Sequence, residues 1–376
     1  MSPDVALATL SLAAWLYLVF AHGRFWQADQ RVDGRAPDPE RWPSVVVVMP
    51  ARNEADVVAR AVTSLLDQDY PGPFRVVLAD QESDDGTAEV ARVAAKEHDR
   101  GHRLVIERTG ERPPGWAGKP WALQTGLGRA EVEAPFAEFW LFTDADVAHS
   151  PGNLRRLVAK TAAERLDLVS LMVRLRAEVG IARLLVPAYV YFFQKLFPFP
   201  RINDPRSDMA AAAGGCVLVR REALDRAGGL EPLRGESIDD CALASALKRH
   251  GRVWVGLTDS ERSLRCYQGV RGVWEMVARR AFTRLGHSWP LLAGTLAGLL
   301  LLYAAPPLLA VLGGGLAAGL AAGAWCLMAA SFLPTLTLYG GPAWWGFALP
   351  IAGILYAGMT LDSALRHARS PGRSGR

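Results

Sequence analysis

The sequence predicts a membrane protein whose central part folds as an α/β domain. Of its 376 residues 21% are charged, yet no Asp, Glu, Lys or Arg occurs over residues 288–361. A stretch of that length has no face for water and predicts membrane helices. A second apolar segment lies near the start, over residues 5–20. Between the two, apolar β-branched runs alternate with amphipathic segments, which is typical of an α/β domain.

The first apolar segment predicts a retained membrane anchor over residues 1–23. It is followed by Arg24, Arg31, Arg35 and Arg41, and basic residues after an anchor place the next domain in the cytoplasm. A cleaved signal peptide is the alternative, although no basic residue precedes the apolar run. We therefore expect a multi-pass protein of the inner (plasma) membrane with a cytoplasmic domain. The four cysteines form no C-x-x-C pair and predict reduced thiols.

The cytoplasmic domain is expected over residues 38–287 and opens with a β-α-β-α-β succession. Its strands are predicted at residues 44–49, 74–79, 103–106 and 139–143. Its first helices are predicted at residues 54–67 and 86–97, where apolar side chains recur at helical spacing. Residues 181–199 stand out because they crowd aromatic and aliphatic side chains between basic residues and prolines. We expect this segment to lie in the membrane interface, with an ordinary core helix as the alternative.

Three apolar stretches follow, at residues 289–312, 316–338 and 343–361, before a basic tail at 362–376. The middle stretch has Gly315, Gly319 and Gly323 at four-residue spacing, which predicts close helix packing in lipid. An anchor plus three crossings would put the basic tail outside, against the positive-inside bias. One stretch is therefore expected to be a re-entrant or interfacial hairpin, and Pro306-Pro307 favours the first.

The basic balance of the chain does not indicate a nucleic-acid partner. The net charge is +4 and the pI is about 9.0. Four arginines of the tail account for the whole of that excess, so the rest of the chain is neutral. A basic patch of the kind that binds phosphate backbones is therefore not predicted.

Two carboxylates follow the predicted strand at 139–143. Asp144 and Asp146 come at the carboxyl end of this strand, where open α/β sheets keep their ligand sites. Such a pair can share Mg²⁺ or Mn²⁺ with a diphosphate. The spacing alone is weak evidence, because Asp67 and Asp69 repeat it. That second pair precedes Tyr-Pro-Gly and is interpreted as turn chemistry.

Polar residues also follow the first two strands and predict a nucleotide pocket. Asn53 and Asp85 could each be simple helix caps. Together with the neighbouring carboxylates they suit the base and ribose of a nucleotide, and a lysine further on suits its phosphates. The candidate nucleotide-binding residues are Pro50, Ala51, Asn53, Glu54, Asp80, Lys119 and Asp144.

Asp239 and Asp240 are adjacent carboxylates at the start of a predicted helix. They can serve the helix dipole alone. Beside a metal-bound diphosphate, one of them can instead take a proton from an attacking hydroxyl. Residue types and spacing leave both interpretations open.

The order of these motifs resembles the family 2 glycosyltransferases with the GT-A fold, over residues 43–284. The motifs are Val45 to Glu54, Asp80 to Thr87, Gly118 to Leu123, Asp144 to Asp146, Gly214 to Cys216, and Asp239-Asp240. Asp69-Tyr70-Pro71-Gly72, Asn203-Asp204-Pro205-Arg206 and Ile238 to Leu243 further resemble the hopene-associated glycosyltransferases of bacterial membranes.

The resemblance implies a role for each matching carboxylate. Asp80 would contact the nucleotide base, Asp144 the nucleotide or metal, and Asp146 the metal, which is Mg²⁺ or Mn²⁺. Asp240 would be the catalytic base of an inverting transfer. Arg279, Arg280 and Arg284 stand where the family holds the product diphosphate, although their spacing departs from its motif. Gln81 stands where a second Asp is usual.

The expected function is therefore metal-dependent transfer of a sugar, from a UDP-sugar or another nucleotide-sugar, to a hydroxyl of a membrane lipid, with a hopanoid link. The expected partners are this donor, the lipid acceptor and the bilayer, and no nucleic acid. A processive polysaccharide synthase is the second enzyme hypothesis. It is disfavoured because three or four apolar segments are few helices from which to form a channel for a polymer. A catalytically silent membrane scaffold with the same fold is the rival from another class.

Overall fold

The chain forms two compact units, in a computed structural model that describes residues 2–32, 36–235, 239–267 and 269–369, without the side chain of Asp239. The α/β unit comprises Gln30–Arg176 and Arg201–Arg265. The helical unit comprises Met1–Asp29, Ala177–Pro200 and Cys266–Gly375. Residues 177–200 and 266–287 thus group with the apolar helices rather than with the sheet.

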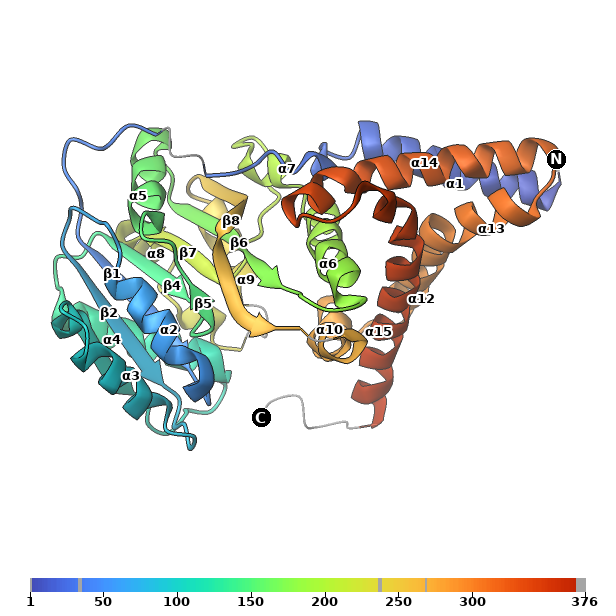
Figure 1. The fold of residues 1–376 in the computed structure, drawn as a ribbon. Helices are drawn as coiled ribbons and strands as arrows, with labels where there is room; N and C mark the ends of the chain where they lie inside the picture. The colour runs from blue at the N-terminus through green and yellow to red at the C-terminus, as the bar shows by residue number, and fades with distance from the viewer. Residues whose placement is uncertain (1, 33–35, 236–238, 268, 370–376) are drawn as a thin grey trace. The chain divides into compact units, whose positions relative to one another are not determined.

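A mixed eight-stranded sheet forms the centre of the α/β unit (Figure 1). Its strand order is β3-β2-β1-β4-β7-β6-β8-β5. The strands are β1 Val45–Ala51, β2 Phe74–Asp80, β3 Leu104–Arg108, β4 Phe139–Thr143, β5 Val147–Ala148, β6 Leu168–Arg176, β7 Cys216–Arg220 and β8 Val253–Cys266. β1 pairs in parallel with β2 and β4, and β2 pairs in parallel with β3. β7 pairs antiparallel with β4 and β6, and β5 with β8.

The α-helices of this unit connect the strands. They are α2 Ala55–Leu66, α3 Thr87–Lys96, α4 Gly118–Glu133, α5 Asn153–Glu164, α8 Arg221–Arg226 and α9 Asp239–Lys248, while α7 Phe199–Asn203 spans the boundary with the helical unit. The four strands and two helices predicted for residues 44–143 are confirmed to within two residues. They were predictable because local apolar periodicity specifies both helices and buried parallel strands.

β1 is the best-buried strand, because helices cover both of its faces. Val47 and Met49 pack with Val58 and Leu65 of α2 in one core cluster. On the other face α4 comes so close that a Cβ on Gly126 would lie 2.6 Å from Val48 Cγ1. Each fully buried aliphatic side chain contributes about 1.5–3 kcal/mol, so this sandwich fixes the strand on whose end the site is built.

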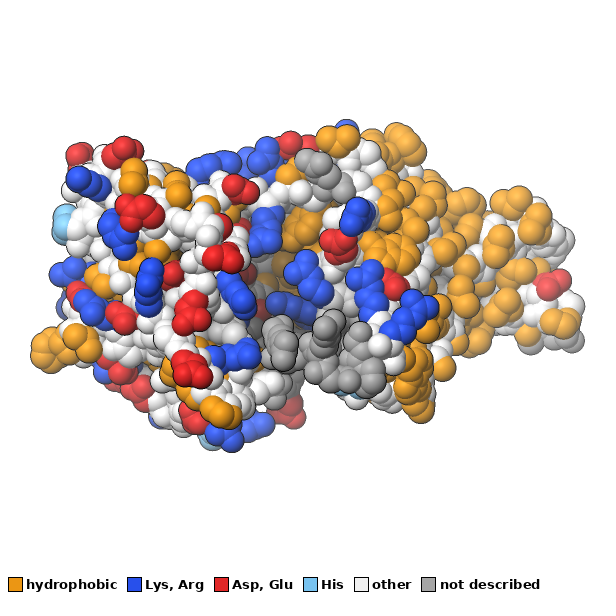
Figure 2. All heavy atoms as spheres, turned by 90° about the horizontal axis from the view of Figure 1, so that it is seen from below, with side chains coloured by type: hydrophobic (Ala, Val, Ile, Leu, Met, Phe, Trp, Pro, Cys, Tyr) orange, Lys and Arg blue, Asp and Glu red, His pale blue; other side chains and the backbone are white. Residues whose placement is uncertain are grey.

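The helical unit contains four stretches that are long and apolar enough to cross a membrane: Pro3–Phe20, Trp289–Leu312, Gly315–Leu338 and Ala343–Arg369. Its helices are α1 Pro3–Phe20, α6 Ala182–Leu196, α10 Gly269–Ala278, α11 Ala281–Arg284, α12 Trp289–Leu299, α13 Ala305–Leu312, α14 Gly315–Leu338 and α15 Leu349–Arg369. Hydrophobic side chains cover much of this unit on the face seen in Figure 2. Leu308, Val311, Leu312 and Leu316 are all more than half exposed, as lipid-facing residues would be.

α1 and α14 pack through alanines rather than through the predicted glycine face. Ala8 forms a cluster with Ala317 and Ala321. A Cβ on Gly319 would meet nothing within 4 Å, and Gly315 has φ +53. The prediction that the three glycines line a helix contact was therefore wrong for Gly315 and Gly319 and holds for Gly323, where a Cβ would lie 3.7 Å from Leu12 of α1. The small residues that let α1 and α14 approach each other closely are mainly Ala8, Ala317 and Ala321.

Pro306 and Pro307 interrupt the regular α-helix within the apolar stretch Trp289–Leu312 without ending it. A proline lacks the N–H that would bond the carbonyl four residues earlier. Residues Leu300–Ala304 accordingly form a π-helical segment. Ser11 Oγ donates to the carbonyl of Leu301 at 3.0 Å, and Trp15 Nε1 donates to that of Leu302 at 2.9 Å. The kink is thus compensated by two side chains of α1.

α6 is the aromatic segment expected at the membrane interface. Its Tyr191, Phe192 and Phe193 are all less than a tenth exposed, because they pack within the helical unit. Tyr191 hydrogen-bonds to Ser331 of α14, and the carbonyl of Leu185 accepts from Tyr356 of α15. α6 is therefore an integral part of the apolar helical assembly, and its position in the interface stays a prediction.

Candidate active site

The carboxyl ends of β1, β2 and β4 place most of the predicted site residues at one edge of the sheet. Ala51 pairs with Asp80 at the ends of β1 and β2. β4 runs beside β1 in the same direction and ends at Thr143, one residue before Asp144. Parallel strands that end together bring their following loops together. The sequence prediction that these carboxylates share an edge is confirmed by the sheet topology.

Hydrogen bonds tie the loop after β1 to the loop after β2. The N–H groups of Asn53 and Glu54 donate to Ser83 Oγ and Thr87 Oγ1, at 3.0 and 2.8 Å. Asn53 Oδ1 accepts from the N–H of Asp84 at 3.1 Å. Asn53 has φ +54, a left-handed conformation that Asn tolerates well. Its side chain therefore joins two loops and does not cap its own helix.

Asp85 also links the two loops, and Asp80 is buried beneath them. Asp85 accepts from the N–H of Ala55 at 2.9 Å and from that of Thr87 at 2.9 Å. It thus satisfies the first turns of α2 and α3 at once. These contacts, led by the Thr87 hydroxyl, lower the pKa of Asp85. Asp80 is 1% exposed and accepts from the N–H of Ser83 at 3.3 Å.

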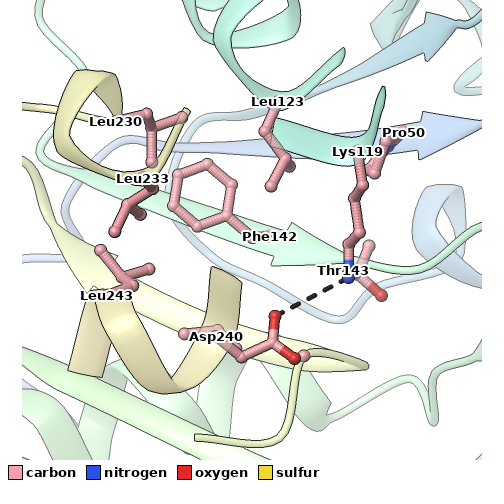
Figure 3. A pocket seen from close by; sticks show the side chains of 11 residues that line it. Pro50, Lys119, Leu123, Phe142, Thr143, Leu230, Leu233, Asp240 and Leu243 are labelled. Carbon is pink, nitrogen blue, oxygen red and sulfur yellow. Dashed lines mark ion pairs between the residues drawn. The ribbon is translucent and has the colours of Figure 1, made fainter. Parts of the chain in front are cut away.

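Lys119 joins two of the predicted carboxylates. It lies in the first turn of α4, and its Nζ is 2.8 Å from Asp144 Oδ1 and 3.7 Å from Asp240 Oδ1. Figure 3 shows its side chain pointing toward Asp240. The structure therefore brings together the carboxylate after β4 and the carboxylate of α9, which are far apart in the sequence.

Arg265 is a site residue that sequence reasoning missed. Its Nε is 2.8 Å from Asp146 Oδ2, and its Nη2 pairs with Glu54. The short strand β5 follows Asp146 directly and pairs with β8, so that Val147 lies opposite Ser263. This pairing sets Arg265 beside Asp146. A two-residue strand leaves no periodic signal in a sequence, so nothing in the sequence pattern could have identified the contact.

Three carboxylates at this edge repel one another. Burial raises the pKa of Asp146, and the charge of Asp144 raises it further, while Arg265 lowers it. Burial also raises the pKa of Glu54, against the lowering effect of Arg265 and with added repulsion from Asp146 and Asp144. Arg265 and Lys119 thus offset the negative charge only in part.

The donor chemistry of Asp144 and Asp146 fits a hard divalent cation. Both offer carboxylate oxygens, which Mg²⁺ and Mn²⁺ prefer, and Mg²⁺ commonly takes only one or two carboxylates beside substrate phosphates. Over the described residues no group of three His, Cys, Asp or Glu side chains is arranged to hold a metal. A cation at this edge would therefore need further ligands from the phosphates of a bound substrate.

Asp240 lies against the backbone of Gly214. A Cβ built on Gly214 would come within 2.2–2.4 Å of the carboxyl atoms of Asp240, so a larger residue there would have to displace this carboxyl group. Gly215 is held in turn, because Thr143 Oγ1 donates to its carbonyl at 2.9 Å. Thr143 also hydrogen-bonds to His149 Nε2 at 2.8 Å. The Gly-Gly motif predicted from the sequence thus has a steric reason.

A small apolar pocket opens beside Asp240 and Lys119 (Figure 3). Its apolar walls are Pro50, Leu123, Phe142, Val217, Leu230, Leu233 and Leu243. Surroundings of this kind lower the local dielectric constant and strengthen the charges at the rim.

The remaining predicted residues lie elsewhere. Asp239 begins α9, but its side chain lies outside the described part of the chain. Arg279, Arg280 and Arg284 belong to the helical unit, where Arg284 lies over the rings of Phe193 and Phe197 at 5.7 and 5.8 Å. Their role toward a diphosphate stays a prediction. The four cysteines form no disulfide in the described part of the chain.

The second D-x-D pair lies away from the site carboxylates. Asp67 follows α2, toward the amino ends of the strands, and its Oδ1 is 2.9 Å from His98 Nε2. Asp69 lies 3.7 Å from Arg155 Nη1. These surface contacts agree with the interpretation that Asp67 and Asp69 belong to a turn and not to a ligand site.

The chain is similar to several solved structures, of which one shows the same fold. The mannosyltransferase PcManGT from Pyrobaculum calidifontis, in complex with GDP-Man and Mn²⁺, matches over 95% of this chain and 99% of its own, with 23% identity and a TM-score of 0.60. TarS residues 1–349 of S. aureus in complex with UDP matches over 87% and 91%, with 14% identity and a TM-score of 0.41. Glucosyl-3-phosphoglycerate synthase from Mycobacterium tuberculosis matches over 57% and 70%, with 20% identity and a TM-score of 0.37.

The family is decided by the sequence profile described as "Glycosyltransferase like family 2", which matches residues 43–284. No curated protein matches the chain. The matched region contains every strand of the sheet and is more than half of the chain. The chain is therefore a GT-A enzyme that belongs to the family 2 glycosyltransferases.

Proposed function

We propose that the protein transfers a sugar from a nucleotide-sugar, with UDP-sugars as the first candidates, to a hydroxyl of a membrane lipid. The observation that carries this proposal is the meeting of Asp144, Lys119 and Asp240 at the carboxyl edge of the sheet. The apolar helices of the same chain support a lipid acceptor. A hopanoid acceptor is supported by the sequence resemblance alone.

Each residue of the edge has a task in this proposal. Asp144 and Asp146 would hold Mg²⁺ or Mn²⁺ together with the donor's diphosphate, and a cation bound there would supply positive charge to the leaving group. Asp240 accepts the proton of the acceptor hydroxyl, and attack at the anomeric carbon inverts its configuration. Asn53, Glu54 and Asp80 contact the nucleoside, with the backbone of Pro50 and Ala51.

A donor panel tests the proposal directly. We expect the purified protein, with Mn²⁺ and extracted lipids, to release the nucleoside diphosphate from one nucleotide-sugar far faster than from the others. Mass spectrometry of lipids from cells with and without the gene should show one species heavier by a single sugar. A series of products with many sugars would instead support a polysaccharide synthase. No turnover of any donor would favour the scaffold hypothesis.

Protonation should control the affinity for Mn²⁺. Because the pKa of Asp146 is raised above 3.8, its carboxyl keeps a proton at a higher pH than usual and then cannot bind a cation. We expect Mn²⁺ affinity to be full near neutral pH and to fall as the pH is lowered through this raised pKa. Electron paramagnetic resonance of free Mn²⁺ measures it. Arg265→Gln removes a charge that lowers this pKa, so it should move the loss to higher pH, and a shift in the other direction would contradict the assignment.

We further propose that α1, the continuous stretch Trp289–Leu312 (α12 with α13) and α14 cross the membrane and that α15 is re-entrant. Ala8 packs with Ala317, and Leu12 lies 3.7 Å from a Cβ on Gly323, so α1 and α14 run in the same direction. The other end of the bundle is marked by α6, since Gln194 reaches Thr335 and the carbonyl of Lys195 meets His22.

The chain after α14 first turns back into the helical unit. Trp325 Nε1 donates to the carbonyl of Phe347 at 3.2 Å, half-way along α14. α15 then ends beside the helices that precede α12, because Asp362 accepts from Trp274 of α10 and Ser363 from the N–H of Phe282. Both ends of this segment thus belong to the side where α12 begins. This proposal places the re-entrant segment third, not first, among the apolar stretches.

The topology makes a prediction about the tail. With α15 re-entrant, Arg366 and Arg369 at its end return to the side of α6, in agreement with the positive-inside bias. We expect a green fluorescent protein fused after the tail to fluoresce and a fused alkaline phosphatase to stay inactive. A fusion after Gly314, between α13 and α14, is the control and should behave in the opposite way. Active phosphatase at the tail would mean that α15 crosses the membrane.

A further inference from the structure

A second pocket lies at the opposite edge of the same sheet. It is lined at the amino ends of β1, β2 and β3 by Ser44, Phe74, Arg75, His102 and Arg103, together with Val45, Pro73, Glu133 and Ala134. β2 runs from Phe74 to Asp80, so at about 3.3 Å per residue this amino-edge pocket lies about 20 Å from the carboxylates. Its volume of about 340 Å³ falls in the range of small-molecule sites.

Cations dominate the lining of the amino-edge pocket. Arg75 and Arg103 have no carboxylate within ion-pair distance in the described part of the chain, whereas many other arginines of the α/β unit do, for example Arg41, Arg92 and Arg156. Glu133 is the acidic residue of the lining, and its Oε1 is already bound by Arg129 at 2.6 Å. The pocket is therefore positive at a place where the protein provides no compensating charge.

Arg103 shows most clearly that a partner is missing. Its guanidinium lies over the ring of Phe74, 4.3 Å from the centroid, which fixes its plane. Its Nη1 is buried and has no hydrogen-bond partner. Burial lowers the pKa of Arg103, and the nearby charges of Arg100 and Arg75 lower it further. A buried N–H of a charged group is costly to leave unpaired, so an acceptor at this point would be strongly favoured.

Arg75 is aimed at the same place. Its Nη1 reaches the carbonyl of His102 at 3.4 Å, which draws it across from β2 toward the residue before Arg103. Arg100 is different, because its Nη1 already donates hydrogen bonds to the carbonyls of Leu66 and Gln68 at the end of α2. Arg75 and Arg103 are thus the two cations still available to a ligand.

We propose that the amino-edge pocket binds a phosphate group, held by Arg103 and Arg75. Phosphate offers only acceptor oxygens, and the planar guanidinium fork matches it in geometry and charge. The phosphate is either free in solution or the head group of a lipid. This site is separate from the proposed donor site, because the diphosphate of a donor would bind at the other edge of the sheet.

The test uses the full chain in a neutral detergent, with a chelator present so that the carboxyl edge carries no cation and repels anions. Calorimetry measures binding of inorganic phosphate and, separately, of short-chain dihexanoyl phosphatidic acid. We expect Arg103→Gln to weaken phosphate binding by about tenfold or more, since charged hydrogen bonds are strong. Arg75→Gln should weaken it too, and Arg103→Lys should fall between Arg103→Gln and the wild type.

Arg92→Gln is the matched control, because Arg92 is an exposed arginine of the same unit that pairs with Glu89. It should bind phosphate within about twofold of the wild type. Equal losses in Arg92→Gln and Arg103→Gln would reduce the effect to net charge and overturn the site, as would a wild type that binds neither ligand. Tighter binding of the lipid would identify a head group as the source, and equal binding would identify free phosphate. UDP binding with Mn²⁺ should be unchanged in Arg103→Gln, which shows that the variant is folded.

Discussion

Asp146→Ala should lower the affinity for UDP in the presence of Mn²⁺ by up to about a hundredfold. The substitution removes one of the two carboxylates proposed to hold the cation, and losing a charged partner costs up to ~3 kcal/mol. Calorimetric titration of UDP with Mn²⁺ measures the effect. With a chelator in place of Mn²⁺ the sign should reverse, because the substitution removes a negative charge from the edge and Arg265 then shares its charge with one carboxylate fewer.

Asp67→Ala is the control for that result. Asp67 belongs to the second D-x-D pair, is exposed, and pairs with His98. Its loss should leave UDP affinity within about twofold of the wild type, as for most surface substitutions. Equal losses in the two variants would mean that the wrong carboxylate pair has been chosen. A loss in Asp146→Ala that persists with the chelator would mean that the aspartate contacts the nucleotide without a cation.

The part of this site that could be predicted from the sequence is the part that follows strand ends. Asp80 is the last residue of the buried strand β2 and Asp144 directly follows β4, and parallel order then requires that they share an edge. Both steps use local information, namely an apolar run and the polar residue that ends it. This explains why six elements over residues 44–143 were predicted within two residues.

The rest depends on contacts between distant segments. Arg265 reaches Asp146 only because β8 pairs with a strand of two residues. Lys119 could be predicted as a cation of the site but not as a bridge to Asp240, because that contact joins α4 to α9 across 121 positions of sequence. The same holds for α6, whose burial against α14 and α15 follows from tertiary packing and not from its composition.

Asp240→Asn should cut lipid glycosylation by about 10²–10⁴-fold, which is the usual contribution of a general base. An alcohol is a poor nucleophile at neutral pH, so inverting transfer needs a base within hydrogen-bond reach of its hydroxyl. Asn has the same shape but does not accept the proton. We expect UDP affinity to be preserved, because Lys119 keeps its closer partner Asp144 at 2.8 Å. The measurements are turnover and UDP binding on the same preparation.

Asp239→Asn is the first control, since the family resemblance alone selects Asp240 over its neighbour. Near-normal turnover in Asp240→Asn would remove Asp240 as the base, and a selective loss in Asp239→Asn would move the role by one residue.

A glycine substitution tests the same role without changing a carboxylate. A Cβ at Gly214 would fall within 2.2–2.4 Å of the Asp240 carboxyl group, so Gly214→Ala must displace it. If Asp240 acts as the base, this shift should reduce turnover and leave UDP affinity largely intact, because misplacement by about 1 Å can cost 10²-fold. Gly128→Ala on α4 is the matched control, since its Cβ would meet nothing within 4 Å. Normal turnover in Gly214→Ala would show that the position of Asp240 does not matter, and an ordinary helix-start carboxylate would then be the better description.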